Sequence, residues 1–171
     1  HREMMDQKTT NVFLCGIGGQ GVILASEILA ETAVIEGWDV KKSEIRGLSQ
    51  LGGGVDSSIR WGRAVYSPVI PKGNIDFILA LTEEKIASYT KQLNAGGYII
   101  KGTYQEYTKL PHIKSANVFM LGKLSFCLDF KDESWISAMT ALLKAHLVEM
   151  NLKAFFMGKE EQKRYVSYNI Q

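Results

Sequence analysis

The chain has 171 residues, of which 46% are apolar, so residues 1–171 can form a single domain with its own core. With 20 basic and 18 acidic residues, it has no basic field for nucleic acid or anionic lipid. No apolar stretch approaches the ~20 residues of a membrane span and the N-terminal region lacks the apolar core of a signal peptide, so we expect a cytoplasmic protein with neither nucleic-acid nor membrane partners.

The first predicted elements are a strand, a tight turn and a helix. The apolar run Val12–Cys15 breaks into glycines and restarts as an amphipathic helix over about residues 20–36. The glycines follow the G-x-G-x-x-G spacing, which lets backbone approach a pyrophosphate and points helical N–H groups at an anion. No Lys-Ser or Lys-Thr follows, which excludes a nucleotide-triphosphate loop. The candidate ligand-binding residues of this turn are Gly16, Gly18, Gly19, Gln20 and Gly21.

A dinucleotide site also needs an acidic residue at the end of the second strand, roughly 20 residues downstream of the turn. Glu36 falls in the last turn of the helix, and only Glu44 could end a strand that begins near Trp38. Two interpretations of the turn therefore stay open. It binds a dinucleotide or flavin, or its glycines serve only close packing of strand and helix.

The next segment carries a second glycine cluster, over residues 43–54. Ordering so permissive a loop costs on the order of 1–2 kcal/mol per residue, which hints at close backbone approach to a ligand. Loops at the carboxyl ends of strands line the ligand crevice of an open α/β sheet, so both glycine clusters should share one sheet edge. The alternative is that these glycines only allow turns. The candidate residues here are Glu44, Arg46, Gly47, Gln50, Gly52 and Gly53.

The middle of the chain predicts more strands. Asp76–Leu81 and Gly97–Ile100 are apolar runs typical of central parallel strands, with a polar helix over about 82–93 between them. Val55–Trp61 alternates apolar and polar residues and then turns toward Ala64–Tyr66, which predicts an antiparallel hairpin with one wet face, inserted at the sheet edge. The expected fold is α/β, a Rossmann-like, mostly parallel sheet flanked by helices, with this hairpin and C-terminal helices.

The chain after Pro111 is predicted to be helical. The apolar pattern favours a helix over 117–130, and Asp132 can cap a second helix that continues to His146. Asn151 can cap a third helix. We also expect exposed apolar area around Trp61, Tyr66, Phe155 and Phe156, which would favour a homodimer of the isolated chain.

Catalytic and metal-binding machinery is not evident in the sequence. Cys15 and Cys127 are too few for a site of four thiolates, and we expect reduced core thiols. His112 and His146 are expected in a loop and on a helix face, with no nucleophile and base at suggestive spacing. The sequence predicts no catalytic residue and no metal site in this chain.

Five segments in order resemble the gamma subunit, or gamma domain, of 2-oxoacid:ferredoxin oxidoreductases. They contain both glycine clusters, the segment around Val65–Ala80, and two segments in the helical region: residues 16–26, 43–53, 65–80, 117–122 and 151–155. Ser43-Glu44 and Ser67-Pro68 look most like the small subunit of indolepyruvate oxidoreductases. The resemblance covers nearly the whole chain and is more specific than one glycine turn.

The resemblance implies a subunit that is inactive alone and binds no cofactor by itself. Such complexes use thiamine diphosphate, magnesium, iron–sulfur clusters and coenzyme A to convert a 2-oxo acid to acyl-CoA, with electrons passing to ferredoxin. The implied partners are thiamine-binding alpha and beta type subunits and an iron–sulfur subunit. The implied role of this chain is to cover the active site, exclude water, and shape the pocket for substrate and coenzyme A.

One residue departs from the family pattern. Relatives commonly carry an arginine directly before the Gly-Gly pair, where this chain has Leu51. Our hypothesis is that Arg46, in the same loop, supplies the missing charge. The other interpretations are a stand-alone dinucleotide- or flavin-binding module and a scaffold whose glycines serve packing.

Overall fold

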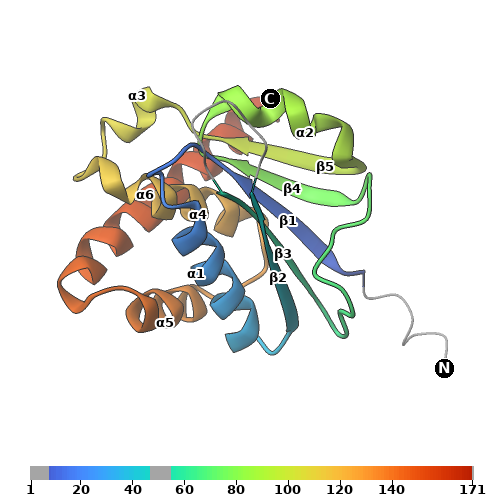
Figure 1. The fold of residues 1–171 in the computed structure, drawn as a ribbon. Coiled ribbons are helices and arrows are strands. Elements are labelled where there is room, and N and C mark those ends of the chain that lie inside the picture. Colours follow the sequence, from blue (N-terminus) through green and yellow to red (C-terminus); the bar gives the residue numbers. More distant parts are fainter. Residues whose placement is uncertain (1–7, 47–54, 171) are drawn as a thin grey trace.

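A computed structural model describes residues 8–46 and 55–170 (Figure 1). Its centre is a five-stranded sheet with the strand order β2-β3-β1-β4-β5. The strands are β1 (Thr10–Cys15), β2 (Asp39–Arg46), β3 (Val55–Gly62), β4 (Ile75–Ala80) and β5 (Leu93–Lys101). β1 pairs in parallel with β4, and β4 with β5, whereas β3 is antiparallel to both of its neighbours. Four strands therefore run in one direction, which confirms the α/β prediction.

The predicted hairpin exists with a different second strand. β3 pairs with β2 from Arg46↔Val55 to Asp39↔Gly62, and residues 64–66 form no strand. β3 also pairs with β1, so it lies inside the sheet and not at its edge. The sequence prediction was wrong because it paired adjacent segments across Gly62-Arg63, whereas β2 supplies a longer ladder.

The helices begin and end close to their predicted positions in the first half of the chain and less closely afterwards. They are α1 (Val22–Ile35), α2 (Ile86–Tyr89), α3 (Tyr104–Tyr107), α4 (Ala116–Cys127), α5 (Asp132–Leu142) and α6 (Ala145–Asn169), with short 3-10 turns η1 (Glu83–Lys85), η2 (Thr90–Gln92) and η3 (Ile113–Ser115). The helix expected over 82–93 is thus three short helical pieces. The helix favoured over 117–130 is confirmed as α4.

Two predicted helix caps are wrong. The N-cap of α5 is Lys131, and Asp132 is the first helical residue, whose carboxylate pairs with Lys159 at 2.6 Å. Asn151 lies inside α6, where its Nδ2 donates a hydrogen bond to the Leu147 carbonyl. The chain is extended at Leu143 and Lys144, which separates α5 from α6. The helix predicted to continue to His146 is therefore divided between α5 and α6, and α6 begins before Asn151.

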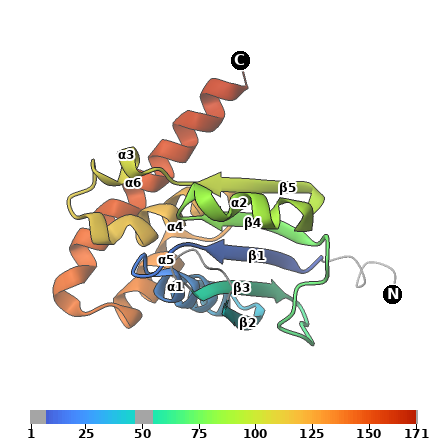
Figure 2. The same ribbon diagram turned by 45° about the horizontal axis from the view of Figure 1, so that its top comes forward.

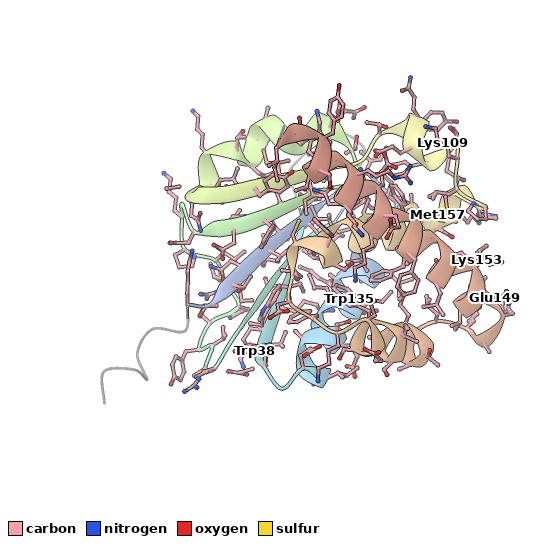
Figure 3. All side chains as sticks on the ribbon, turned by 180° about the vertical axis from the view of Figure 1, so that it is seen from behind. Trp38, Lys109, Trp135, Glu149, Lys153 and Met157 are labelled. Carbon is pink, nitrogen blue, oxygen red and sulfur yellow. The ribbon has the colours of Figure 1, made fainter. Side chains whose placement is uncertain are left out.

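The two faces of the sheet carry separate cores. Alternate β1 residues point to opposite faces: Val12 and Leu14 pack with α1, α4, α5 and α6, while Phe13 and Cys15 pack on the side of α2. Figure 1 shows α2 beside β4 and β5, and Figure 3 shows α6 crossing in front of the strands when the molecule is seen from behind. Figure 2 shows the last turns of α6 projecting beyond the sheet.

The larger core depends on a close crossing of α4 and α6. A Cβ added to Gly122 would lie 1.9 Å from the Phe155 carbonyl oxygen, and one added to Gly158 would lie 1.9 Å from the Phe119 carbonyl oxygen. The two glycines therefore let each backbone touch the other. Trp61 (4% exposed) and Phe155 (0%) are core residues, which contradicts the predicted exposed patch. Of the other two residues in that prediction, Tyr66 is strongly exposed and Phe156 is half-buried.

Candidate functional site

β1 and β4 are neighbouring parallel strands, and the helices that follow their carboxyl ends pack on opposite faces of the sheet. α1 follows β1 and packs on one face, whereas α2 follows β4 and packs on the other. Open α/β sheets bind ligands in the crevice that this divergence creates. Two hollows occupy this edge, and Ile17 lines both of them.

The first hollow lies over the glycine turn and has a volume of about 420 Å³. Its lining includes Gly18, Gly19, Gly21 and the first residues of α1, together with Val55 at the start of β3. Ala25 donates the first helical hydrogen bond to the Gly21 carbonyl, and no side chain caps α1. The preceding N–H groups of Val22, Ile23 and Leu24 have no partner within the helix, so they can receive an anionic or carbonyl group.

Contacts within the chain fix the shape of the turn. Gly19 and Gly21 adopt left-handed φ angles of 82° and 76°, a conformation that favours glycine. The Gln20 Oε1 accepts a hydrogen bond from the Ile17 N–H at 2.8 Å, and its Nε2 donates to the Leu81 carbonyl at 3.4 Å. The Gln20 side chain therefore braces the turn against the end of β4. The predicted residues 16–21 do lie together at one edge, as expected.

The second hollow, of about 400 Å³, follows β4 and β5. Thr82, Glu83, Glu84 and Tyr104 line it along with Gln20, and the nearby Lys101 pairs with Glu83 at 3.2 Å. Among the described residues that line the two hollows there is no lysine or arginine. An anionic ligand held here would therefore need its balancing charge from another segment or another chain.

The second predicted glycine cluster is only partly described. β2, which carries Glu44 and Arg46, ends at the same sheet edge as β1, and β3 starts there. Glu44 is exposed, with its carboxylate 3.8 Å from the Lys42 Nζ. Gly47, Gln50, Gly52 and Gly53 lie outside the described residues. Because β3 separates β2 from β1, the Glu44 strand is two strand spacings, roughly 10 Å, from the glycine turn.

A buried polar network beneath this edge has no counterpart in the sequence-based prediction. The Lys85 Nζ lies 3.0 Å from the Asp56 Oδ1, and the Tyr89 hydroxyl donates to the Asp56 Oδ2 at 2.7 Å. Asp56 is 1% exposed and Lys85 4%. We expected this face of β3 to be wet; instead η1 and α2 cover it. The one signal in the sequence was a carboxylate, Asp56, on an otherwise strand-like segment.

Burial and charge in this network affect nearby thiol and phenol groups. Burial chiefly, with the Asp56 charge adding to it and Lys85 opposing, raises the pKa of Cys15 to about 12. Burial and the hydrogen bond to Asp56 also raise the pKa of Tyr89. Cys15 is therefore a neutral, buried thiol near neutral pH, in keeping with a structural role.

The remaining candidate groups are dispersed. His112 lies exposed before η3, where its Nδ1 accepts a hydrogen bond from the Lys114 N–H, and His146 is exposed on α6. Within residues 8–46 and 55–170, no group of three or more histidine, cysteine, aspartate or glutamate side chains is placed to hold a metal ion. In the same part of the chain, no helix combines the length and the apolar character needed to cross a membrane.

The crevice and the glycine turn define an α/β domain with two hollows at the carboxyl ends of β1 and β4. The profile of the pyruvate ferredoxin/flavodoxin oxidoreductase family matches residues 11–161. The indolepyruvate oxidoreductase subunit IorB of Methanothermobacter thermautotrophicus is 32% identical over 187 aligned positions, covering 86% of this chain and 95% of that subunit. The chain belongs to the pyruvate ferredoxin/flavodoxin oxidoreductase family, which confirms the resemblance drawn from the sequence.

Solved structures agree with this assignment. The gamma subunit of keto/oxoacid ferredoxin oxidoreductase from Geobacter sulfurreducens matches with a TM-score of 0.74 and 27% identity, over 91% of this chain and 99% of that one. The 2-oxoglutarate:ferredoxin oxidoreductase from Magnetococcus marinus matches with a TM-score of 0.79 over 93% of this chain and 32% of that one. At 16% identity, the second match supports the fold alone.

Proposed function

We propose that this chain is the gamma-type subunit of a 2-oxoacid:ferredoxin oxidoreductase that oxidatively decarboxylates a 2-oxo acid to acyl-CoA. The observation that carries the proposal is the crevice, where Val22 and Ile23, at the N-terminus of α1, line a hollow that contains no catalytic pair among its described residues. A site of this kind contacts a ligand whose chemistry is performed elsewhere. The chain then acts as one domain of a cytoplasmic complex and is inactive alone.

In this proposal the neighbouring subunits hold thiamine diphosphate with magnesium, and an iron–sulfur subunit passes electrons to ferredoxin. Thiamine diphosphate supplies the reactive carbon that attacks the 2-oxo acid. This chain covers that centre with the turn of residues 16–21 and with the segment that follows β2. Its backbone N–H groups receive a carboxylate or phosphate oxygen, and its apolar lining, including Ile17 and Val55, excludes water.

The substrate class is drawn from the relatives. IorB of M. thermautotrophicus is named as a subunit of indolepyruvate oxidoreductase and aligns over most of both chains. We therefore propose an aromatic 2-oxo acid of the indolepyruvate type as substrate. Coenzyme A is the acyl acceptor in this proposal, and Arg46 provides the cation that the described lining of the two hollows lacks.

A stand-alone dinucleotide or flavin module is the second candidate, since the α1 N-terminus faces a hollow. The sheet order speaks against it, because β3 separates β1 from Glu44, the candidate ribose ligand. Absorbance of the purified chain tests this function directly. A yellow chromophore or a nicotinamide that quenches tryptophan fluorescence would favour the module.

The main test is native mass measurement of the complex from the source cell, paired with coenzyme A-dependent reduction of a viologen dye by 2-oxo acids. We expect co-purification with larger thiamine-binding and cysteine-rich subunits, and activity with indolepyruvate above that with pyruvate.

Arg46→Met in the reconstituted complex should raise the Michaelis constant for coenzyme A or the oxo acid. Unchanged constants for both would exclude the role of Arg46.

A further inference from the structure

Two members of the buried network of Asp56, Lys85 and Tyr89 are chain neighbours of residues that line the two hollows. Asp56 directly follows Val55, which lines the hollow over the glycine turn. Lys85 directly follows Glu84, which lines the hollow after β4. The antiparallel register that pairs Leu14 with Ser57 places Asp56 across from Cys15, the last residue of β1. The network thus joins β3, η1 and α2 beside the sheet edge that carries the two hollows.

Stability alone is a weak reason for this arrangement. Removing two charges from water carries a large free-energy cost, and replacing a buried pair with apolar residues is often neutral or stabilising. A buried pair does strongly penalise any geometry that separates its partners, because each would become an unpaired buried charge. The Asp56–Lys85 pair at 3.0 Å therefore fixes the position of η1 relative to β3.

Tyr89 extends the same constraint to α2. Its hydroxyl occupies the second Asp56 oxygen at 2.7 Å, and its ring packs on Phe13 of β1 with centroids 4.3 Å apart. Both carboxylate oxygens then have partners within the network, and Asp56 is 1% exposed. The three polar groups can position neighbouring residues but are not available for chemistry.

We propose that Asp56, Lys85 and Tyr89 are positioning residues that fix the two walls of the crevice relative to each other. One wall carries Val55, which lines the hollow over the glycine turn, and the other carries Glu83 and Glu84, which line the hollow after β4. The inference rests on the proposed function, since it assigns these residues to the binding geometry for the 2-oxo acid or coenzyme A. It adds residues that contact no ligand and that lie on the opposite face of the sheet from α1.

Tyr89→Phe is the mildest test variant, because it keeps the ring contact with Phe13 and removes only the hydroxyl. Lys85→Met is the stronger variant, and Lys85→Arg restores the charge. Lys159→Met is the matched control, since it removes an ion pair of 2.6 Å with Asp132 that joins α6 to α5, away from the crevice. If Lys85→Met fails to fold, the same measurements are made on Tyr89→Phe and on the double variant Asp56→Leu/Lys85→Met.

The first measurement is amide hydrogen exchange by NMR on the full chain. The Leu81 N–H donates to the Cys15 carbonyl at 2.8 Å, directly between the two walls. We expect Tyr89→Phe and Lys85→Met to speed exchange at Leu81 about tenfold or more through local opening, with Lys159→Met unchanged there. Exchange at Leu81 equal in all variants would overturn the proposal.

The second measurement uses the reconstituted complex and separates positioning from simple structural support. We expect the Michaelis constant for coenzyme A or the 2-oxo acid to rise about fivefold in Tyr89→Phe while kcat changes less than about twofold, with partial rescue of Lys85→Met by Lys85→Arg. Faster exchange with unchanged Michaelis constants would overturn the positioning role. A wild-type complex without 2-oxo acid activity would instead refute the proposed function, and the exchange measurement would still decide whether the network fixes the crevice.

Discussion

Glycines serve opposite purposes in two regions of this molecule. At the crossing of α4 and α6, a Cβ on Gly122 or Gly158 would lie 1.9 Å from a carbonyl oxygen of the other helix. At the turn after β1, a Cβ on Gly19 would have no neighbour within 4 Å among the described residues. Glycine thus allows close backbone contact between α4 and α6, whereas at the turn after β1 it leaves the backbone exposed.

The difference shows which glycines determine the fold and which are available to a ligand. The helix crossing has no free space, so its glycines are explained by internal packing. Gly19 is exposed and lines a hollow, so internal packing does not account for it. Its left-handed φ of 82° gives one local reason for glycine, and close approach of a ligand or a neighbouring chain gives another.

The largest effect is expected at the helix crossing. Gly158→Ala places a methyl group against the Phe119 carbonyl and must push α6 away from α4, which also disturbs Phe155 in the core. We expect a loss of about 3 kcal/mol or more in the free energy of unfolding. Urea denaturation followed by circular dichroism measures this loss.

Gly96→Ala is the matched control for that variant. Gly96 lies on β5, and its nearest neighbour for an added Cβ is the Asn94 Oδ1 at 3.8 Å, an ordinary contact. We expect a change within about 0.5 kcal/mol. Equal midpoints for the two variants would contradict the close-packing explanation of Gly158.

Gly21 combines both kinds of constraint, and its substitution should have an intermediate effect. Its φ is 76°, and an added Cβ would lie 2.5 Å from the Asn117 Nδ2 of α4. We expect Gly21→Ala to cost about 2 kcal/mol, of which about 1 kcal/mol is backbone strain. The Asn117 Nδ2 also donates to the Gly21 carbonyl at 3.2 Å, so Gly21→Ala is compared with Gly21 in the Asn117→Ala background, where only the strain portion of its cost should remain. No cost of Gly21→Ala in that background would show that backbone strain is negligible at this position.

Periodicity and glycine spacing in the sequence were sufficient to predict the strand, turn and helix of residues 12–35, the strands β4 and β5, and the helix α4. The strand β3 was assigned the wrong partner, because alternation identifies a strand but not its neighbour in the sheet. The prediction that Asn151 caps a helix was wrong for a related reason. A residue type that caps helices can also occupy a helix interior when its amide bonds to the Leu147 carbonyl.

The candidate site was predictable in part. Glycine spacing placed residues 16–21 at a strand-to-helix turn, and parallel topology placed the end of β2 at the same edge. The Asp56–Lys85 pair was not predictable, because its partners are separated by 29 positions along the chain and come from segments whose pairing the sequence did not reveal. The brace formed by Gln20 was missed because it depends on the carbonyl of Leu81, which only the packed sheet brings near.

Gln20 tests whether the open turn is held by its own contacts. Gln20→Leu removes the acceptor for the Ile17 N–H and the donor to the Leu81 carbonyl. Leaving these partly buried groups unpaired should cost about 1–2 kcal/mol in the free energy of unfolding. Gln20→Glu keeps the acceptor and should lose less, so similar midpoints for the two variants would argue that the Ile17 contact contributes little.

Gly19→Ala is expected to have the smallest effect on stability and the most informative effect on function. Because no atom of residues 8–46 and 55–170 lies within 4 Å of the added methyl group, the expected cost is backbone strain of about 1 kcal/mol. If a ligand or a neighbouring chain approaches this backbone in the complex, the methyl group occupies that space, and the rate of coenzyme A-dependent dye reduction should fall about tenfold. Gly37→Ala is the matched control, because Gly37 also has a left-handed φ, of 92°, and open space around it, but lies after α1. Equal activity of the two variants would mean that the turn needs glycine for its backbone conformation alone. The difference between the packed glycines of the helix crossing and the exposed Gly19 would then say nothing about function.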